Sequence, residues 1–153
     1  MIPTVWEFTI YGAPAAQARP RFANGRSYRA GRSVQWEANA AQAMATAWEA
    51  SHGPPEGRDE PLAVSVLAVF PRPKRLVWKR REMVRLPHTT KPDVDNVGKS
   101  VLDAVTQAGL IADDRLVHRL SLVKCIAAGN EVPRVEIKLD WGAVDAPPQR
   151  RRA

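Results

Sequence analysis

Nine consecutive residues in the middle of the chain, Leu62–Phe70, restrict the fold more than any other stretch. All of them are apolar except Ser65, and prolines flank the run at Pro61 and Pro71. The run is too short for a membrane-spanning helix, which needs about 18 apolar residues, and no stretch of the chain approaches that length. Uninterrupted apolar character is typical of a strand that is covered on both faces. We therefore expect Leu62–Phe70 to be a central strand of a sheet.

Further strands are expected on both sides of this run. Val5–Tyr11 and Arg134–Asp140 alternate between apolar and polar residues, which is the pattern of a half-buried strand. Another strand is expected from Asp113 to position 124 or 125. Gly129-Asn130 has the composition of a hairpin turn that would lead into the last strand. Together these segments predict a sheet of about four strands.

Two helices are expected between the strands. The first would be capped by Ser33 and would run to about Ala50, with small apolar residues along two stripes. The second would begin between Val94 and Asn96. It would stop before Gly109, because glycine accepts the left-handed backbone found just past helix ends. Strands and helices in this order predict an α+β fold with a mixed sheet.

The chain is short and basic. Its 153 residues suffice for one domain, assigned to residues 1–142, and carry a formal net charge of +7. Residues 143–153 form a basic, proline-containing tail that we expect to be disordered. The N-terminus lacks a basic segment followed by an apolar run, so no signal peptide is expected, and the single Cys125 cannot form an internal disulfide. These features favour a cytoplasmic protein.

Acidic residues gather at the start of the second helix and again after its end. Asp93 and Asp95 stand at the start, and Asp113-Asp114 stand at the beginning of the next strand. One interpretation is a capped helix with a solvated polar face, because aspartate is a common cap. However, Asn96 is able to cap alone, and adjacent like charges destabilise a fold unless a cation is near. Carboxylates concentrated in a basic protein indicate a divalent metal held against a polyanion.

Two basic segments are expected to flank the acidic residues. Residues 19–32 contain five arginines and no acid, and a turn at Asn24-Gly25 would close a hairpin that places Arg21 and Arg26 side by side. Residues 72–91 contain eight basic residues and one acid. Such runs are often only solvated surface, but arginine matches phosphate oxygens, so two of them beside an acidic site favour phosphate binding. An anionic membrane is the competing partner, and no amphipathic basic helix is evident.

Two residues in the second basic segment have open roles. Trp78 is placed either to stack on an unpaired base or to pack on its own loop, and we favour its own loop. His88 either assists catalysis or makes a local hydrogen bond, and we favour the hydrogen bond.

The acidic segment resembles a known family. Lys91-Pro92-Asp93-Val94-Asp95-Asn96-Val97-Gly98-Lys99, followed by Asp103-Ala104, Gly109, Asp113-Asp114 and a strand ending in Lys124, is similar to RusA, the Holliday-junction resolvases of bacteria and their prophages. The resemblance is tightest from Lys91 to Lys124. It extends loosely to the first strand, to Arg19-Pro20-Arg21-Phe22 and to the final strands. The ordered set of residues at these spacings is much more specific than a single Asp-x-Asp-Asn.

The resemblance implies a RusA-like fold, a symmetric homodimer, and magnesium-dependent cleavage of four-way junction DNA by paired nicks in recombination and repair. Mn²⁺ is a possible substitute for Mg²⁺. Asp93, Asp95 and Asp114 match the family's metal-binding acids, Asp113 is a plausible helper, and Lys99 matches the essential lysine. The catalytic set is therefore Asp93, Asp95, Asp114 and Lys99. The expected DNA contacts are Arg19, Arg21, Arg26, Lys79, Arg80, Arg81 and Lys91.

Two other functions stay open at this point. The same metal chemistry would serve a nuclease that acts on other branched or flapped DNA. Alternatively, the chain is a noncatalytic nucleic-acid-binding module whose acids are only caps and surface charges. Relative cleavage of junction, flap and duplex DNA distinguishes these functions.

Overall fold

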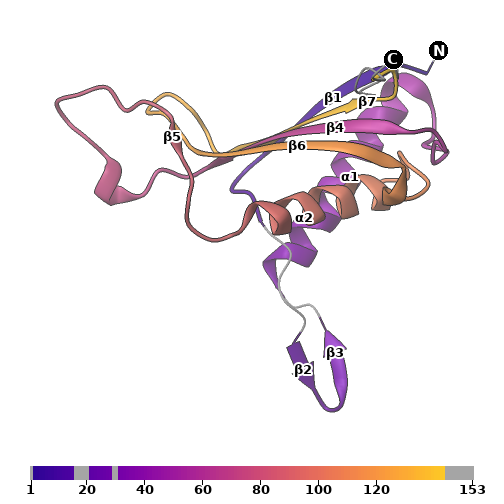
Figure 1. Cartoon of the computed structure of the whole chain (residues 1–153), viewed down its shortest axis with the longest axis horizontal. Coiled ribbons are helices and arrows are strands. Elements are labelled where there is room, and N and C mark those ends of the chain that lie inside the picture. The colour runs from indigo at the N-terminus through magenta and orange to yellow at the C-terminus, as the bar shows by residue number, and fades with distance from the viewer. Residues whose placement is uncertain (1, 16–20, 29–30, 144–153) are drawn as a thin grey trace, which may run out of the picture.

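Two helices pack against one face of a five-stranded mixed sheet (Figure 1). This computed structural model describes residues 2–15, 21–28 and 31–143, without the side chains of positions 21, 27 and 28. The helices are α1, Arg32–His52, and α2, Val94–Gln107. The sheet has the order β1-β7-β4-β6-β5, formed by β1 Val5–Tyr11, β7 Arg134–Asp140, β4 Leu62–Phe70, β6 Val117–Ile126 and β5 Leu86–Pro87. The predicted α+β class is confirmed, with five strands in the sheet in place of about four.

Strand β4 lies in the middle of the sheet, as its apolar run predicted. It pairs in parallel with β6 and antiparallel with β7. Leu62 and Val64 belong to the core against the helices and are fully buried. Ser65 and Leu67 are only half-buried, and they line a hollow of about 480 Å³. Within the described residues, β4 is therefore less completely covered than the sequence predicted.

Strands β6 and β7 do not form the hairpin that Gly129-Asn130 predicted. A turn is present at these residues, but β4 lies between the two strands. Strand β6 pairs with β4 on one side and with the short β5 on the other. A turn-forming dipeptide specifies a local reversal of the chain, whereas the partner of a strand depends on which apolar faces meet in the core.

The two helices begin and end close to the predicted positions. Gly31 precedes α1, and Ser33 lies inside the helix, where it is 3% exposed and does not provide the predicted cap. Helix α2 begins at Val94, within the predicted interval. Gly109 follows its end with a φ of +77°, and its N–H donates to the carbonyl oxygen of Thr106 at 3.0 Å. The left-handed backbone predicted for Gly109 is therefore confirmed.

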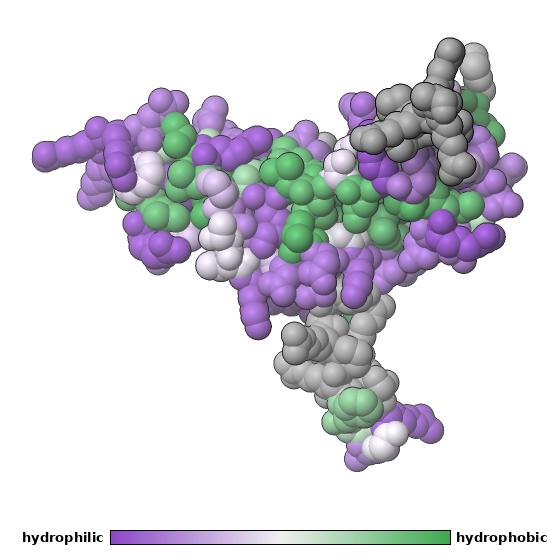
Figure 2. All heavy atoms as spheres, viewed as in Figure 1, coloured by the Kyte–Doolittle hydropathy of each residue, from purple (hydrophilic) through white to green (hydrophobic). Residues whose placement is uncertain are grey.

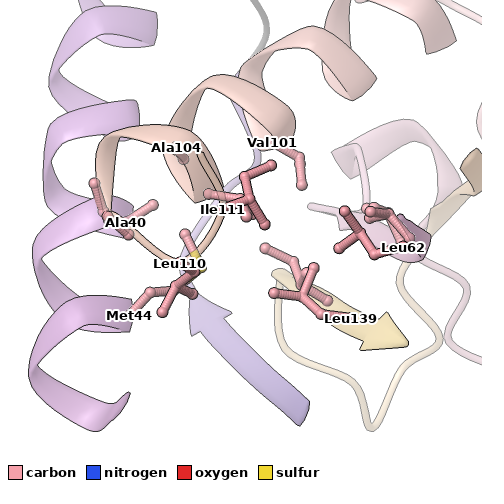
Figure 3. Close-up of a cluster of buried hydrophobic side chains, with 14 of the residues drawn as sticks. Ala40, Met44, Leu62, Val101, Ala104, Leu110, Ile111 and Leu139 are labelled. Carbon is pink, nitrogen blue, oxygen red and sulfur yellow. The ribbon is translucent and has the colours of Figure 1, made fainter. Parts of the chain in front are cut away.

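The hydrophobic core lies between the two helices and the sheet (Figure 3). Met44 of α1, Val101 and Ala104 of α2 and Leu139 of β7 are all fully buried. Burial of a valine or leucine side chain stabilises a fold by about 1.5–3 kcal/mol. Because the apolar stripe of α2 packs in this core, most of its polar residues face the surface.

A separate hairpin is formed by β2, Arg21–Ala23, and β3, Arg26–Tyr28, and it lies apart from the sheet and helices in Figure 1. Asn24 and Gly25 have φ angles of 51° and 72°, so the predicted turn is confirmed. In the strand register Arg26 is opposite Ala23, and Arg21 is opposite Tyr28. The prediction that Arg21 and Arg26 are side by side is therefore wrong, because each arginine is paired with a different residue.

In the described part of the chain, no helix combines the length and the apolar character that a bilayer crossing requires. Residues 144–153, which make up nearly all of the expected basic tail, lie outside the described residues.

Candidate active site

The first acidic group surrounds the N-terminus of α2. Asp93 occupies the N-cap position with an extended backbone, and its carbonyl oxygen accepts the N–H of Val97 at 3.1 Å. Its carboxylate makes no capping hydrogen bond. Asp95 lies in the first turn, Lys99 follows one turn later, and the side chains of Asp93, Asp95 and Lys99 are all exposed. The Asp93 carboxylate is therefore available to a ligand, which weakens the interpretation of this residue as a cap.

Lys124 of β6 holds the segment that leads into α2. Its Nζ donates hydrogen bonds to the carbonyl oxygens of Thr90, at 2.9 Å, and of Pro92. Pro92 immediately precedes Asp93, so the position of the first carboxylate depends on this lysine. The sequence pattern included Lys124 but did not reveal this role, because the bonds join residues that are 32 and 34 positions apart.

Close packing against β6 also determines how near the N-terminal end of α2 lies to the sheet. A Cβ atom on Gly98 would lie 3.1 Å from Cδ2 of Leu120 and 3.7 Å from Cδ1 of Leu122. The first of these distances is shorter than ordinary van der Waals contact, so a larger residue would require the Leu120 side chain to shift, whereas glycine lets the helix and the strand approach closely as they are. The Asp-x-Asp-Asn segment is therefore held from two sides, by Lys124 and by the contact at Gly98.

His88 lies on the segment between β5 and α2. Its ring stacks on Phe70 with 4.0 Å between ring centroids, and its backbone N–H donates to the carbonyl oxygen of Lys124 at 3.2 Å. Burial, reinforced by the positive charge of Lys124, lowers the pKa of His88 below its usual range. The local hydrogen bond that the sequence favoured comes from the backbone, and the imidazole ring contributes packing.

The second acidic group lies beyond the other end of α2. Asp113 precedes a 3₁₀ turn, Asp114–Leu116, and its carboxylate accepts the N–H of Arg115 at 2.8 Å. This bond is the main reason that the pKa of Asp113 lies below its usual range. The expected strand therefore starts only at Val117, because Asp113 and its neighbours form a capped turn instead.

A hollow of about 400 Å³ adjoins the second acidic group. Four carboxylates contribute to its lining, which is made of Glu37, Asp103, Thr106, Gln107, Ala112, Asp113 and Asp114. Glu37 of α1 is 3% exposed and accepts a hydrogen bond from Oγ of Ser100 at 3.4 Å. Glu37 could not be recognised from the sequence, because it is an isolated acidic residue in the first half of a helix of mostly small apolar residues.

The two acidic groups are well separated within one chain. Asp95 and Thr106, which borders the second group, are 11 residues apart on α2, or about 16 Å along the helix axis. In the described part of the chain, no three His, Cys, Asp or Glu side chains are close enough together to hold a metal ion. Convergence of Asp93, Asp95 and Asp114 on one metal therefore stays a prediction, and the described chain does not bring these three residues together.

The basic residues expected to contact DNA lie in separate parts of the structure. Lys79, Arg80 and Arg81 are exposed on the loop between β4 and β5, which extends from one end of the sheet (Figure 1) and is hydrophilic at its outer end, with apolar residues beside it (Figure 2). Lys91 is exposed beside Asp93, and Arg26 is exposed on the separate hairpin. Arg19 and the side chain of Arg21 lie outside the described residues.

The loop between β4 and β5 is attached firmly to the β6–β7 connection. The Arg85 guanidinium donates to both carboxylate oxygens of Glu131, and Arg134 donates to the same carboxylate at 3.0 Å. The hydrogen bond from Arg85 is the main reason that the pKa of Glu131 falls to about 2. In addition, the N–H of Gly129 donates to the carbonyl oxygen of Met83 at 2.8 Å. These bonds fix the base of the loop between β4 and β5, residues 71–85, which we call the basic loop.

Comparison with known proteins agrees with the expected family. The family model described as endodeoxyribonuclease RusA matches residues 12–140, a range that contains both acidic groups and the basic loop. The chain is 31% identical over 140 residues to the uncharacterized protein YqaN of Bacillus subtilis, and the aligned region covers 87% of this chain and 94% of that protein. It is 30% identical over 79 residues to the crossover junction endodeoxyribonuclease RusA of Aquifex aeolicus, and the aligned region covers 42% of this chain and 63% of that protein.

Proposed function

The chain belongs to the RusA endodeoxyribonuclease family, and from this premise we propose that it is a magnesium-dependent, structure-specific endonuclease that resolves Holliday junctions by paired symmetric nicks. One observation carries most weight. Asp93 stands at the N-cap of α2 with a carboxylate that does not cap, beside an exposed Asp95 and one turn before an exposed Lys99.

The donor set of the first acidic group fits a magnesium ion. Mg²⁺ prefers oxygen ligands, and proteins usually hold it with one or two carboxylates together with water and substrate phosphate. Asp93 and Asp95 would supply those carboxylates. When bound, a divalent ion lowers the pKa of water and neutralises negative charge on the phosphodiester that is cleaved.

Lys99 would position the DNA backbone. It lies four residues after Asp95, so the two side chains lie on one face of α2. A lysine there attracts a phosphate and stabilises the negative charge that develops on it during hydrolysis. The firm attachment of this helix end at Lys124 and Gly98 supports such a role, because electrostatic stabilisation requires groups that are held in place before reaction.

A homodimer would provide one active site for each of the two nicks. It would also bring the second acidic group of one protomer to the first acidic group of its partner. The carboxylates of Asp113 and Asp114 lie near the opposite end of α2 from Asp95. In a two-fold dimer with antiparallel α2 helices, Asp93 and Asp95 of one protomer would approach Asp114 of the partner subunit. Such a dimer would satisfy the predicted metal set without any rearrangement inside one chain. Light scattering at micromolar concentration should give twice the mass of 16.9 kDa, and a monomer with paired-nick activity would refute the dimer.

The function is tested by cleavage of a mobile four-way junction with and without magnesium. Flap and fully paired duplex DNA serve as comparison substrates. The proposal expects paired nicks in the junction only when magnesium is present. Asp95→Asn and Asp114→Asn should abolish cleavage and leave junction binding intact or tighter, because each removes a negative charge from beside the phosphate. Retained cleavage by the Asp114→Asn protein would refute the assignment of the site, and preferential cleavage of flaps would assign another branched substrate.

A further inference from the structure

Trp78 lies in the basic loop with two arginines over its indole ring. The guanidinium carbon of Arg81 is 3.6 Å from the ring centroid, and that of Arg72 is 4.5 Å away. The packing of Trp78 on its own loop, which the sequence favoured, is therefore present. Trp78 is nevertheless only partly buried.

The two arginines differ in how firmly they are held. Arg72 donates hydrogen bonds to the carbonyl oxygens of Leu76 at 2.6 Å, Val84 at 2.8 Å and Ala127 at 3.1 Å. Arg81 is exposed, and within the described part of the chain it has the ring contact but no hydrogen bond or ion pair. Arg72 is thus part of the framework of the loop, whereas Arg81 can leave the ring without breaking another interaction.

Hydrogen bonds within the chain hold the framework around Trp78. Arg72 connects residues of the loop with Ala127 beyond β6, and the bonds of Glu131 and Gly129 close its base. A ring held in this way loses little conformational freedom when a flat group stacks on it. Arg81 and the adjacent Arg80 provide the positive charge that attracts a DNA backbone toward the same place.

We propose that Trp78 is a stacking site for an unpaired base of branched DNA, and that such a base takes the place of the Arg81 guanidinium on the ring. This inference rests on the proposed function, and it adds the part of the substrate that the basic loop recognises. Stacking of a base on an aromatic ring is stronger than an exposed cation–π contact. The displaced Arg81 becomes available to a phosphate, so the exchange replaces one weak contact with two. A base inside a continuous duplex is paired and stacked and cannot make this contact.

The test uses a DNA duplex with one bulged 2-aminopurine nucleotide and a matched duplex in which the same 2-aminopurine is paired. Both are titrated with protein in EDTA, so that binding is measured without cleavage. Wild-type protein should quench the fluorescence of the bulged probe and should bind the bulged DNA more tightly than the paired DNA. Trp78→Ala should lose the quenching and about 5- to 150-fold of the affinity for bulged DNA, with little change for paired DNA. Trp78→Phe, which keeps a flat ring, should recover part of both.

Arg75→Ala, at an exposed position of the same loop, is the matched control: it should keep the quenching and weaken the binding of both DNAs by a similar factor. Arg81→Ala should also keep the quenching, because it leaves the ring open to the base. The inference is overturned if the wild type does not quench the bulged probe, or if Trp78→Ala and Trp78→Phe both quench it as the wild type does. It is also overturned if these variants bind bulged and paired DNA more weakly by the same factor. A failure of the proposed function is a separate result, because it shows as a lack of magnesium-dependent junction cleavage and does not alter these binding measurements.

Discussion

Replacement of Asp93 distinguishes a carboxylate that holds a metal from one that only caps a helix. Asp93→Asn and Asp93→Ala both remove the charge, so any loss of favourable interaction with the helix dipole is the same in the two variants. They differ in the ability of the side chain to accept a capping hydrogen bond. The difference in stability between the two variants therefore measures capping alone.

The magnitude follows from the geometry at the N-terminus of α2. A capping side chain replaced by alanine costs about 1 kcal/mol, which in a protein of this size lowers the melting temperature by about 2–4 °C. Because the Asp93 carboxylate makes no capping bond, we expect the two variants to melt within about 1 °C of each other. Both should lose cleavage of a four-way junction.

The assay is thermal unfolding with and without magnesium, together with junction cleavage. Magnesium at a hundredfold excess over its dissociation constant should stabilise the wild type by about 2.7 kcal/mol and should stabilise both variants much less. Glu49→Gln is the control, because it removes one exposed negative charge from α1 and should keep full activity. An Asp93→Ala protein that melts 2–4 °C below Asp93→Asn, cleaves junctions and shows the wild-type response to magnesium would refute the metal assignment.

Three further outcomes are expected from the contacts around the site. Lys124→Met should raise the magnesium concentration needed for cleavage and lower the melting temperature, and Lys124→Arg should be affected less in both respects. Equal cleavage by the wild type and the two variants would contradict the positioning role of Lys124. The folded-state pKa of Glu131, about 2, lies below its usual value of 4.5, so its contribution to stability is present above pH 4.5 and is lost as the pH falls toward 2. The melting temperature of the wild type should thus fall more steeply than that of Glu131→Gln as the pH is lowered over this range. Parallel curves of melting temperature against pH would show that the ion pairs of Glu131 do not cause the loss of stability. Replacement of Arg80 and Arg81 by Gln should reduce the salt dependence of junction binding by about one unit per lost phosphate contact, whereas an unchanged slope would remove them from the DNA interface.

Much of the fold could be predicted because it depends on neighbouring residues. The bounds of β1, β4 and β7 agree with the predicted segments, since an alternating or continuous apolar pattern and the flanking prolines and glycines are local features. The turn at Asn24-Gly25 and the left-handed backbone at Gly109 agree for the same reason. The acidic residues at the start of α2 were also recognisable, because their spacing and order identify the family without knowledge of any contact.

The sequence could not predict contacts between distant segments. The placement of β4 between β6 and β7 depends on how apolar faces meet in the core, and the turn at Gly129-Asn130 carries no information about it. In the same way, Lys124 reaches the carbonyl oxygens of Thr90 and Pro92 only because β6 passes beside the N-terminus of α2.

The acidic residues and their order along the chain could be recognised from the sequence, whereas their positions in space depend on the tertiary structure. Asp93 and Asp95 are near each other because they are two residues apart, but the position of Asp114 follows from the length and direction of α2 between them. That helix is held along its apolar stripe by the core, so its two ends cannot approach within one chain. The nature of the acidic groups is thus a local property of the chain, whereas their separation is a consequence of packing.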